Sequence, residues 1–204
     1  MFTFANGKEK SNMIPHSKDT ISKIGNSIIY LSNKIPNLSK TKLLKLLYLL
    51  EESSAIKNKV PFFGINFEVW QAGPVSKDVF IDLSNPKPVL LKDYINTQHN
   101  VDGTVYVTAK KEFSDDEFSD NDMELMDFVI SKYGHKTATQ LVSLLHKKNS
   151  AWYYEAEKNN LLELFDKKLT TYSDVEIDFN YYLSGCDSEF YKETKELSNH
   201  FAKL

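Results

Sequence analysis

The pattern of apolar positions predicts two consecutive helices near the start of the chain. After Asp19, apolar residues recur at steps of three and four, as they do on one face of an amphipathic helix: Ile21, Ile24, Ile28, Leu31 and Ile35. Pro36 ends this helix, because a proline ring does not fit a helix interior. After Ser39, a candidate N-cap, the stretch KTKLLKLLYLLEESSAI is apolar at positions 43, 44 and 46–50. So wide an apolar surface indicates a helix packed on several sides, which we expect at the centre of the fold.

The next segment combines aromatic residues with a glycine-proline pair. Residues 60–70 (VPFFGINFEVW) are aromatic and β-branched, which favours an extended chain. Gly73 can adopt unusual backbone conformations, and Pro74 suits the first turn of a helix, where its missing N–H costs nothing. We therefore expect a sharp turn, with Trp70 in the core, and a helix from Pro74 through Leu83 that ends before Pro86.

A single β element is predicted between residues 89 and 113. Asp102-Gly103 lies between β-rich runs, which is the strongest short-range signal for a hairpin. Val105 and Val107 alternate with polar or amphipathic neighbours, as in a half-buried strand. Because one hairpin alone is only marginally stable, we expect it to lie against the helices.

The second half of the chain reads as further helices. Ser119 and Asp122 have the spacing of a capping box, Lys132 lies in the last turn of the predicted helix, and Gly134 follows as its C-cap. Three more segments are expected to be helical or to begin a helix: residues 136–148 with Ala138, Leu141, Leu144 and Leu145 inward, the stretch from Ser150-Ala151-Trp152, and a polar terminal helix over 187–203. Residues 170–185 show no clear pattern.

These elements indicate a mainly α fold: a single compact helical domain with a small β-hairpin element. We expect residues 1–18 to be a flexible lead-in, 19–185 to be the folded domain and 186–204 to be a helical tail. No apolar run approaches the roughly 18 to 20 residues of a membrane-spanning helix, and no signal peptide is recognised. A single cysteine, Cys186, rules out an internal disulfide framework, so the expected location is cytoplasmic.

The type of the basic residues and the distribution of charge along the chain make some functions less expected than others. All 25 are lysines, which disfavours functions that depend on bidentate guanidinium contacts to phosphate or guanine, although a genome rich in A and T produces the same bias. Residues 1–60 have a charge balance of +6, and residues 61–204 a balance of −9. Residues 112–127 contain eight acidic residues and no basic one. Such a run is commonly a solvated surface, but it can also attract a basic protein partner.

The candidate chemistry is sparse, and we predict no catalytic, cofactor-binding or metal-binding residue. The five histidines have no metal-ligand spacing, and no phosphate-binding glycine loop or nucleophile elbow is present. Cys186 as a nucleophile with His135 or His146 is the one enzymatic alternative. DNA binding is a second alternative, since residues 19–50 contain two consecutive helices and residues 137–152 could form a helix followed by a turn. The connection within residues 19–50, NKIPNLSKTK, is longer than a helix-turn-helix turn, however, and there is no arginine.

Four short motifs in one order resemble a known family. They are KLLYL (Lys45–Leu49), FEVW (Phe67–Trp70), Gly73-Pro74-Val75, and LVSLLH (Leu141–His146) followed by Trp152. The sequence is similar in these motifs, over roughly residues 19–160, to the Panacea domain of the SocA-like antitoxins. It departs from the common pattern at Val69, at Gln71-Ala72 and at Leu144-Leu145.

The resemblance implies a bacterial or phage-associated antitoxin that neutralises a protein toxin encoded nearby by direct binding. Residues 19–185 would then be the Panacea-like domain, and no cofactor is implied. A homo-oligomer stays open, and a DNA-binding accessory protein is the alternative function. The motif residues are the candidates for partner contact, although packing is the more common reason for such residues: Tyr48, Phe67, Trp70, Gly73, Pro74, Val75, His146 and Trp152.

Overall fold

The computed structural model describes residues 16–201, so the expected flexible lead-in lies almost entirely outside the described residues. The chain forms helices and one hairpin in the following order: α1 (Lys18–Lys34), α2 (Lys40–Asn58), α3 (Lys77–Ser84), β1 (Ile95–His99), β2 (Val105–Ala109), α4 (Asp120–Tyr133), α5 (Ala138–Leu145), α6 (Ala151–Lys158), α7 (Leu161–Asp166), the 3-10 helix η1 (Phe179–Tyr182) and α8 (Gly185–Phe201). The mainly α fold with a small antiparallel β element is therefore confirmed.

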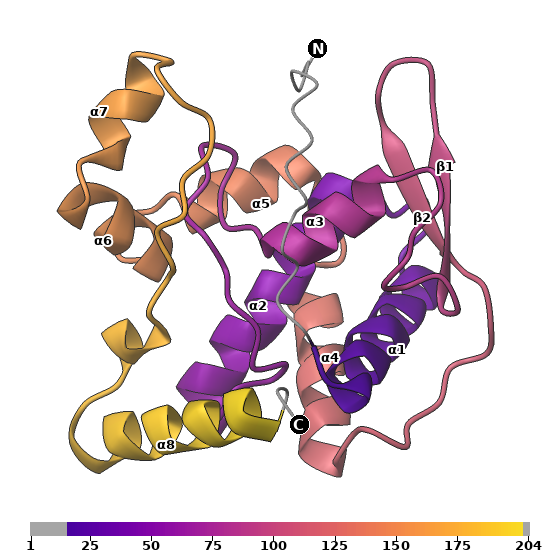
Figure 1. Cartoon of the computed structure of the whole chain (residues 1–204), viewed down its shortest axis with the longest axis horizontal. Helices are drawn as coiled ribbons and strands as arrows, with labels where there is room; N and C mark the ends of the chain where they lie inside the picture. The colour runs from indigo at the N-terminus through magenta and orange to yellow at the C-terminus, as the bar shows by residue number, and fades with distance from the viewer. Residues whose placement is uncertain (1–15, 202–204) are drawn as a thin grey trace.

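Helix α2 lies at the centre of the molecule, as its apolar pattern predicts (Figure 1). Every residue from Leu43 to Leu50 is buried, and the helix packs against α1, α3, α4, α5, β2 and η1. The Ser39 side chain accepts a hydrogen bond from the Lys42 N–H, which satisfies one of the free donors at the helix start. A helix surrounded on all sides needs apolar residues around its whole circumference, which explains the continuous run.

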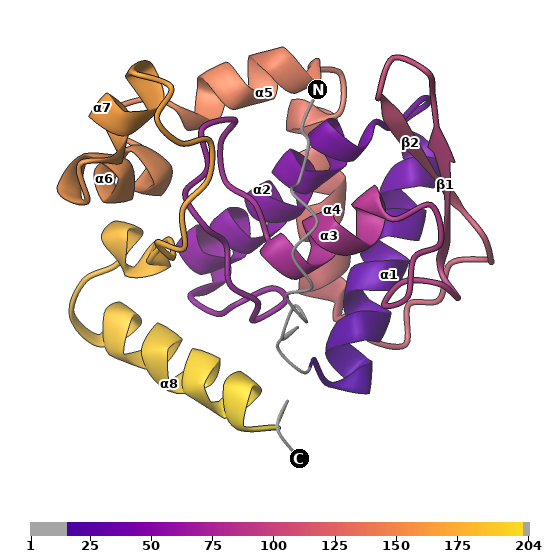
Figure 2. The ribbon, with the colours of Figure 1, turned by 45° about the horizontal axis from the view of Figure 1, so that its top comes forward.

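The hairpin packs against α1 and the start of α2. β1 and β2 pair antiparallel with Thr97 opposite Val107, and the chain reverses at Asp102-Gly103 as predicted. Val105 and Val107 face the core, and the Val107 N–H donates to Leu38 O over 2.9 Å. The hairpin and the α6–α7 pair lie at opposite ends of the molecule (Figures 1 and 2).

The prediction for the glycine-proline segment is wrong in one detail. Helix α3 begins at Lys77 rather than at Pro74, because Val75 is extended and exchanges two backbone hydrogen bonds with Glu68. Residues 60–70 form no regular strand, and only Glu68 makes isolated antiparallel bridges, one to Val75 and one to Glu176. The end of the helix before Pro86 is confirmed.

The remaining helices follow the sequence closely. Ser119 and Asp122 form the reciprocal hydrogen bonds of a capping box, and Gly134 occupies the C-cap of α4. In α5 the buried residues are Leu141 and Leu145, whereas Ala138 and Leu144 are only half-buried. A polar terminal helix is present as α8. None of the helices in residues 16–201 combines the length and apolar character needed to cross a bilayer.

Candidate functional site

The family-like motifs meet around a tight loop between α2 and α3. We call the six residues that come together there the Gly-Pro corner: Lys45, Trp70, Gly73, Pro74, His146 and Trp152. The paired backbones of Glu68 and Val75 close the loop, and the Gly73 N–H donates to Trp70 O over 2.9 Å. Gly73 has φ of +87°, a conformation that residues with a Cβ rarely adopt. The glycine is therefore required by the turn itself.

A buried lysine fixes the corner to the central helix. Lys45 is 1% exposed, and its Nζ donates to Pro74 O over 2.8 Å. A Cβ on Gly73 would lie 3.2 Å from Lys45 Cε and 3.5 Å from His146 Nε2. Gly73 thus allows both side chains to approach the backbone closely, in addition to supplying the turn.

Burial changes the protonation of both groups that face Gly73. It lowers the pKa of Lys45 to about 7, since an ammonium inside the protein loses its hydration. Burial, together with the nearby Lys45 charge, lowers the pKa of His146 to about 4. His146 is therefore neutral at pH 7, and its buried Nε2 has no hydrogen-bond partner among the described residues.

Two aromatic contacts complete the corner. The His146 ring stacks on Trp152 with 3.8 Å between centroids and 9° between planes. The Trp152 Nε1–H donates to Trp70 O over 3.0 Å, so α6 is hydrogen-bonded directly to the loop. Trp70 is only half-buried, contrary to the expectation that it fills the core. Its ring packs on Phe80, while its Nε1–H donates to the Glu68 carboxylate over 2.9 Å.

A second polar cluster, which is partly buried, lies on the same central helix. Tyr48 and Tyr182 both donate their hydroxyl hydrogens to Glu52 Oε1, over 3.0 and 2.7 Å. The Tyr182 hydroxyl also accepts from the Ala151 N–H over 2.8 Å. Burial raises the pKa of Glu52, and the two tyrosine hydrogen bonds oppose this shift. The cluster joins α2, α6 and η1.

Glu51, one residue earlier on α2, is a fully buried carboxylate. It is 1% exposed, and its Oε2 accepts a hydrogen bond from the Phe63 N–H over 2.8 Å. Burial raises its pKa to about 7, although the Phe63 hydrogen bond acts in the opposite direction. The sequence patterns do not predict Glu51, Glu52 or Lys45 as site residues. Their signal is their position within or beside the apolar run of residues 43–50, because charged residues are rarely buried unless they have a partner.

The burial of the predicted contact residues limits which of them a partner can touch. Six are buried: Tyr48, Phe67, Gly73, Pro74, Val75 and Trp152. Only Trp70 and His146 retain partial exposure, so direct partner contact stays a prediction for these two side chains. The arrangement of the other six explains the motifs as the structural frame that joins α2, the loop, α5 and α6.

The acidic run 112–127 is partly engaged within the protein. Asp122 pairs with Lys23 over 3.1 Å in addition to capping α4, and Asp127 accepts a hydrogen bond from the Tyr30 hydroxyl over 2.7 Å. Asp115 and Asp116 are exposed. The run is therefore in part a structural element, and only a subset of its charges faces solvent freely.

The enzymatic alternative finds no supporting contact. Cys186 is exposed in the first turn of α8. His146 lies at the end of α5 against Gly73 and Trp152, and no hydrogen bond joins it to Cys186 within the part of the chain that the structure describes. A search of residues 16–201 for clusters of three or more metal-ligating side chains finds none.

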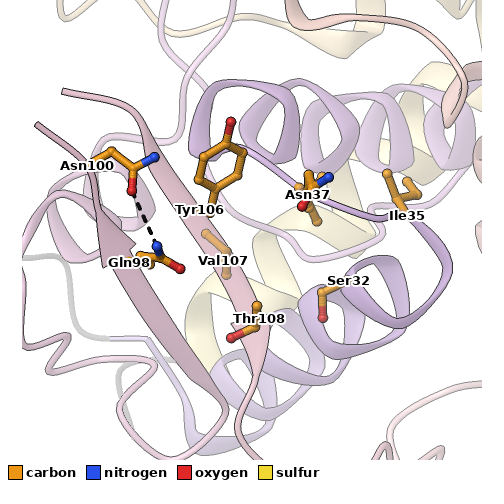
Figure 3. A pocket seen from close by; sticks show the side chains of 9 residues that line it. Ser32, Ile35, Asn37, Gln98, Asn100, Tyr106, Val107 and Thr108 are labelled. Carbon is orange, nitrogen blue, oxygen red and sulfur yellow. Dashed lines mark hydrogen bonds between the residues drawn. The ribbon is translucent and has the colours of Figure 1, made fainter. Parts of the chain in front are cut away.

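A separate cavity of about 380 Å³ lies between the hairpin and the segment that contains the end of α1 and the connection to α2 (Figure 3). Its lining is rich in uncharged polar side chains: Ser32, Asn37, Gln98, Asn100, Tyr106 and Thr108. Gln98 Nε2 donates to Asn100 Oδ1 over 3.4 Å across its rim. No charged side chain lines this cavity, and none of the family-like motifs reaches it.

Comparison with known proteins gives one match. A family model described as "Antitoxin SocA-like, Panacea domain" matches residues 43–153, more than half of the chain. The matched region begins in α2 and ends in α6, so it contains the entire Gly-Pro corner. Neither the curated proteins nor the solved structures that were compared include a significant match.

Proposed function

Because the chain belongs to the SocA-like antitoxins that carry a Panacea domain, we propose that it neutralises a protein toxin by binding it directly. The toxin would be a bacterial or phage-borne protein encoded nearby, and both proteins would act in the cytoplasm. The antitoxin would work by occluding the toxin rather than by catalysis. The family match is the observation that carries this proposal.

The structure of the corner is compatible with a binding module. The motif residues join four elements through buried contacts, including the Trp152–Trp70 and Lys45–Pro74 hydrogen bonds. A rigid frame keeps a binding surface in one conformation, which lowers the entropy lost on association. The frame thus supports presentation of a partner surface, while the surface itself would lie on exposed residues.

A growth assay tests the proposal. A bacterial host would express the neighbouring reading frame alone, with this chain, or with a variant that fails to fold. We expect growth arrest with the neighbour alone and growth restored by at least about tenfold in colony count when the folded chain is present. Arrest that the folded chain does not relieve would contradict the proposal, as would relief by the unfolded variant.

A further inference from the structure

The C-terminal helix α8 is attached to the rest of the protein by few contacts. Tyr191 is its only buried side chain among the residues whose side chains are described. Two polar contacts add to it: Ser188 Oγ donates to Asn180 Oδ1 over 2.9 Å, and Asp187 pairs with Lys59 over 3.6 Å. In both overall views α8 lies along the edge of the molecule, so much of its surface faces outward (Figures 1 and 2).

The outward side of α8 carries two large apolar side chains. Phe190 is 53% exposed and Leu197 is 58% exposed. They are seven residues apart, which places them on the same face of the helix two turns from one another. We call this pair the apolar stripe. A single exposed leucine needs no explanation, whereas two large apolar residues on one face of a peripheral helix supply apolar area that a partner can cover.

A row of glutamates runs beside the apolar stripe. Glu189, Glu193 and Glu196 are spaced four and three residues apart, so they follow one side of the helix. All three are exposed, and none forms a salt bridge with another described residue. We call these three residues the acidic row. Unpaired charges at the edge of an apolar surface favour a partner of opposite charge.

The part of the chain around α8 is also rich in exposed apolar side chains and in acidic residues. Of the ten exposed large apolar side chains in the described region, seven lie between residues 154 and 197. Residues 154–201 also contain 11 acidic residues against 5 lysines, a balance of −6. This part of the chain follows the region matched by the family model, which ends at residue 153. Most of the exposed large apolar side chains of the described residues, together with a net negative charge, thus lie in the segment that follows the matched region.

We propose that the apolar stripe and the acidic row together bind a basic amphipathic helix of the toxin, an inference that rests on the proposed function. The apolar face of the partner helix covers Phe190 and Leu197, and its lysines or arginines pair with the acidic row. A second copy of this chain is a poor occupant, because α8 against α8 brings two acidic rows together and like charges repel. The Gly-Pro corner contributes the frame, and α8 contributes partner choice.

Binding of purified wild-type and variant chains to the growth-arresting neighbour, measured by biolayer interferometry, tests this assignment. The double variant Phe190→Ser/Leu197→Ser should raise the dissociation constant by about 30-fold or more, because loss of central apolar contacts weakens binding at interfaces. The matched control is Val89→Ser/Val101→Ser, which removes two exposed apolar side chains elsewhere and should bind as the wild type does. Circular dichroism should show equal folding, since all four positions are exposed.

The charge component has its own measurement in the same assay. Glu189→Lys/Glu193→Lys/Glu196→Lys should slow association by about tenfold at low salt, with a smaller effect at high salt. If both α8 variants bind the neighbour as the wild type does, the assignment is overturned and the antitoxin role stays intact. A wild-type chain that does not bind the neighbour at all would overturn both. A wild-type dimer that the serine variant converts to monomers would assign the stripe to a second copy and also contradict this inference.

Discussion

Replacement of Trp152 by alanine is expected to lower the free energy of unfolding by about 3 to 5 kcal/mol, the usual cost of deleting a buried tryptophan or phenylalanine side chain. Trp152 is 3% exposed, stacks on His146 and lies 6.3 Å from the Phe165 ring, centroid to centroid. Its removal leaves a cavity between α5, α6 and the loop. It also deletes the hydrogen bond to Trp70 O, which would keep only the Gly73 N–H as a donor.

Urea unfolding followed by circular dichroism measures this effect. The matched control is Tyr154→Ala on the same helix, because Tyr154 is 44% exposed and its removal creates no buried cavity. We expect the control to cost about 1 kcal/mol or less. Equal losses for the two variants would show that Trp152 does not join α6 to the corner in the way described. The variant Trp152→Phe should fall between them, since it restores most of the packing without the N–H donor.

Replacement of Glu51 by glutamine is expected to stabilise the protein by about 3 kcal/mol above pH 7 and to have little effect near pH 4.5. Burial raises the pKa of Glu51 to about 7 from its ordinary value of 4.5. The folded state therefore binds the proton more tightly than the unfolded state does. The stability that depends on this proton is present below pH 4.5 and is lost as the pH rises to 7. Glutamine keeps the oxygen that accepts from the Phe63 N–H and cannot ionise.

The free energy of unfolding is measured against pH for the wild type and for Glu51→Gln, and the difference between the two curves isolates the contribution of Glu51. Lys45 has a pKa lowered by burial, so its own effect is a rise in stability with pH between about 7 and 10.5, which the wild type and the variant share. His146, whose pKa is about 4, contributes equally to both proteins. Glu124→Gln, at an exposed position, is the control and should leave the curve unchanged. A wild-type curve that stays parallel to that of Glu51→Gln from pH 4.5 to 8 would contradict the burial argument.

Local sequence patterns predict the helices well because each pattern reflects either the burial of a helix surface or the hydrogen bonds at a helix end. The run around Leu43–Leu50 predicts a central helix, and Ser119 with Asp122 predicts the start of α4. The same reasoning places the hairpin turn at Asp102-Gly103. It fails at Pro74, where propensity favours a helix start but pairing of Val75 with Glu68 keeps the chain extended. A tertiary contact there overrides a local preference.

The Gly-Pro corner could be predicted only in part. The family-like motifs contain its residues, but nothing in the sequence states that Lys45 and His146, about a hundred positions apart, face the same glycine. The partial exposure of Trp70 could not be predicted either, because it depends on the hydrogen bond that the indole N–H donates to Glu68 at the edge of the core. The exposed stripe on α8 requires knowledge of which face Tyr191 buries. These features depend on how the elements pack, which periodicity does not encode.

Direct binding is the central claim, and size-exclusion chromatography with light scattering tests it most directly. The purified chain would be mixed with the purified neighbour that arrests growth, and the mass and toxic activity of each fraction would be measured. We expect one peak whose mass is the sum of both proteins and whose toxic activity is reduced by at least about tenfold. Two separate peaks, or a joint peak with full toxic activity, would contradict neutralisation by direct binding.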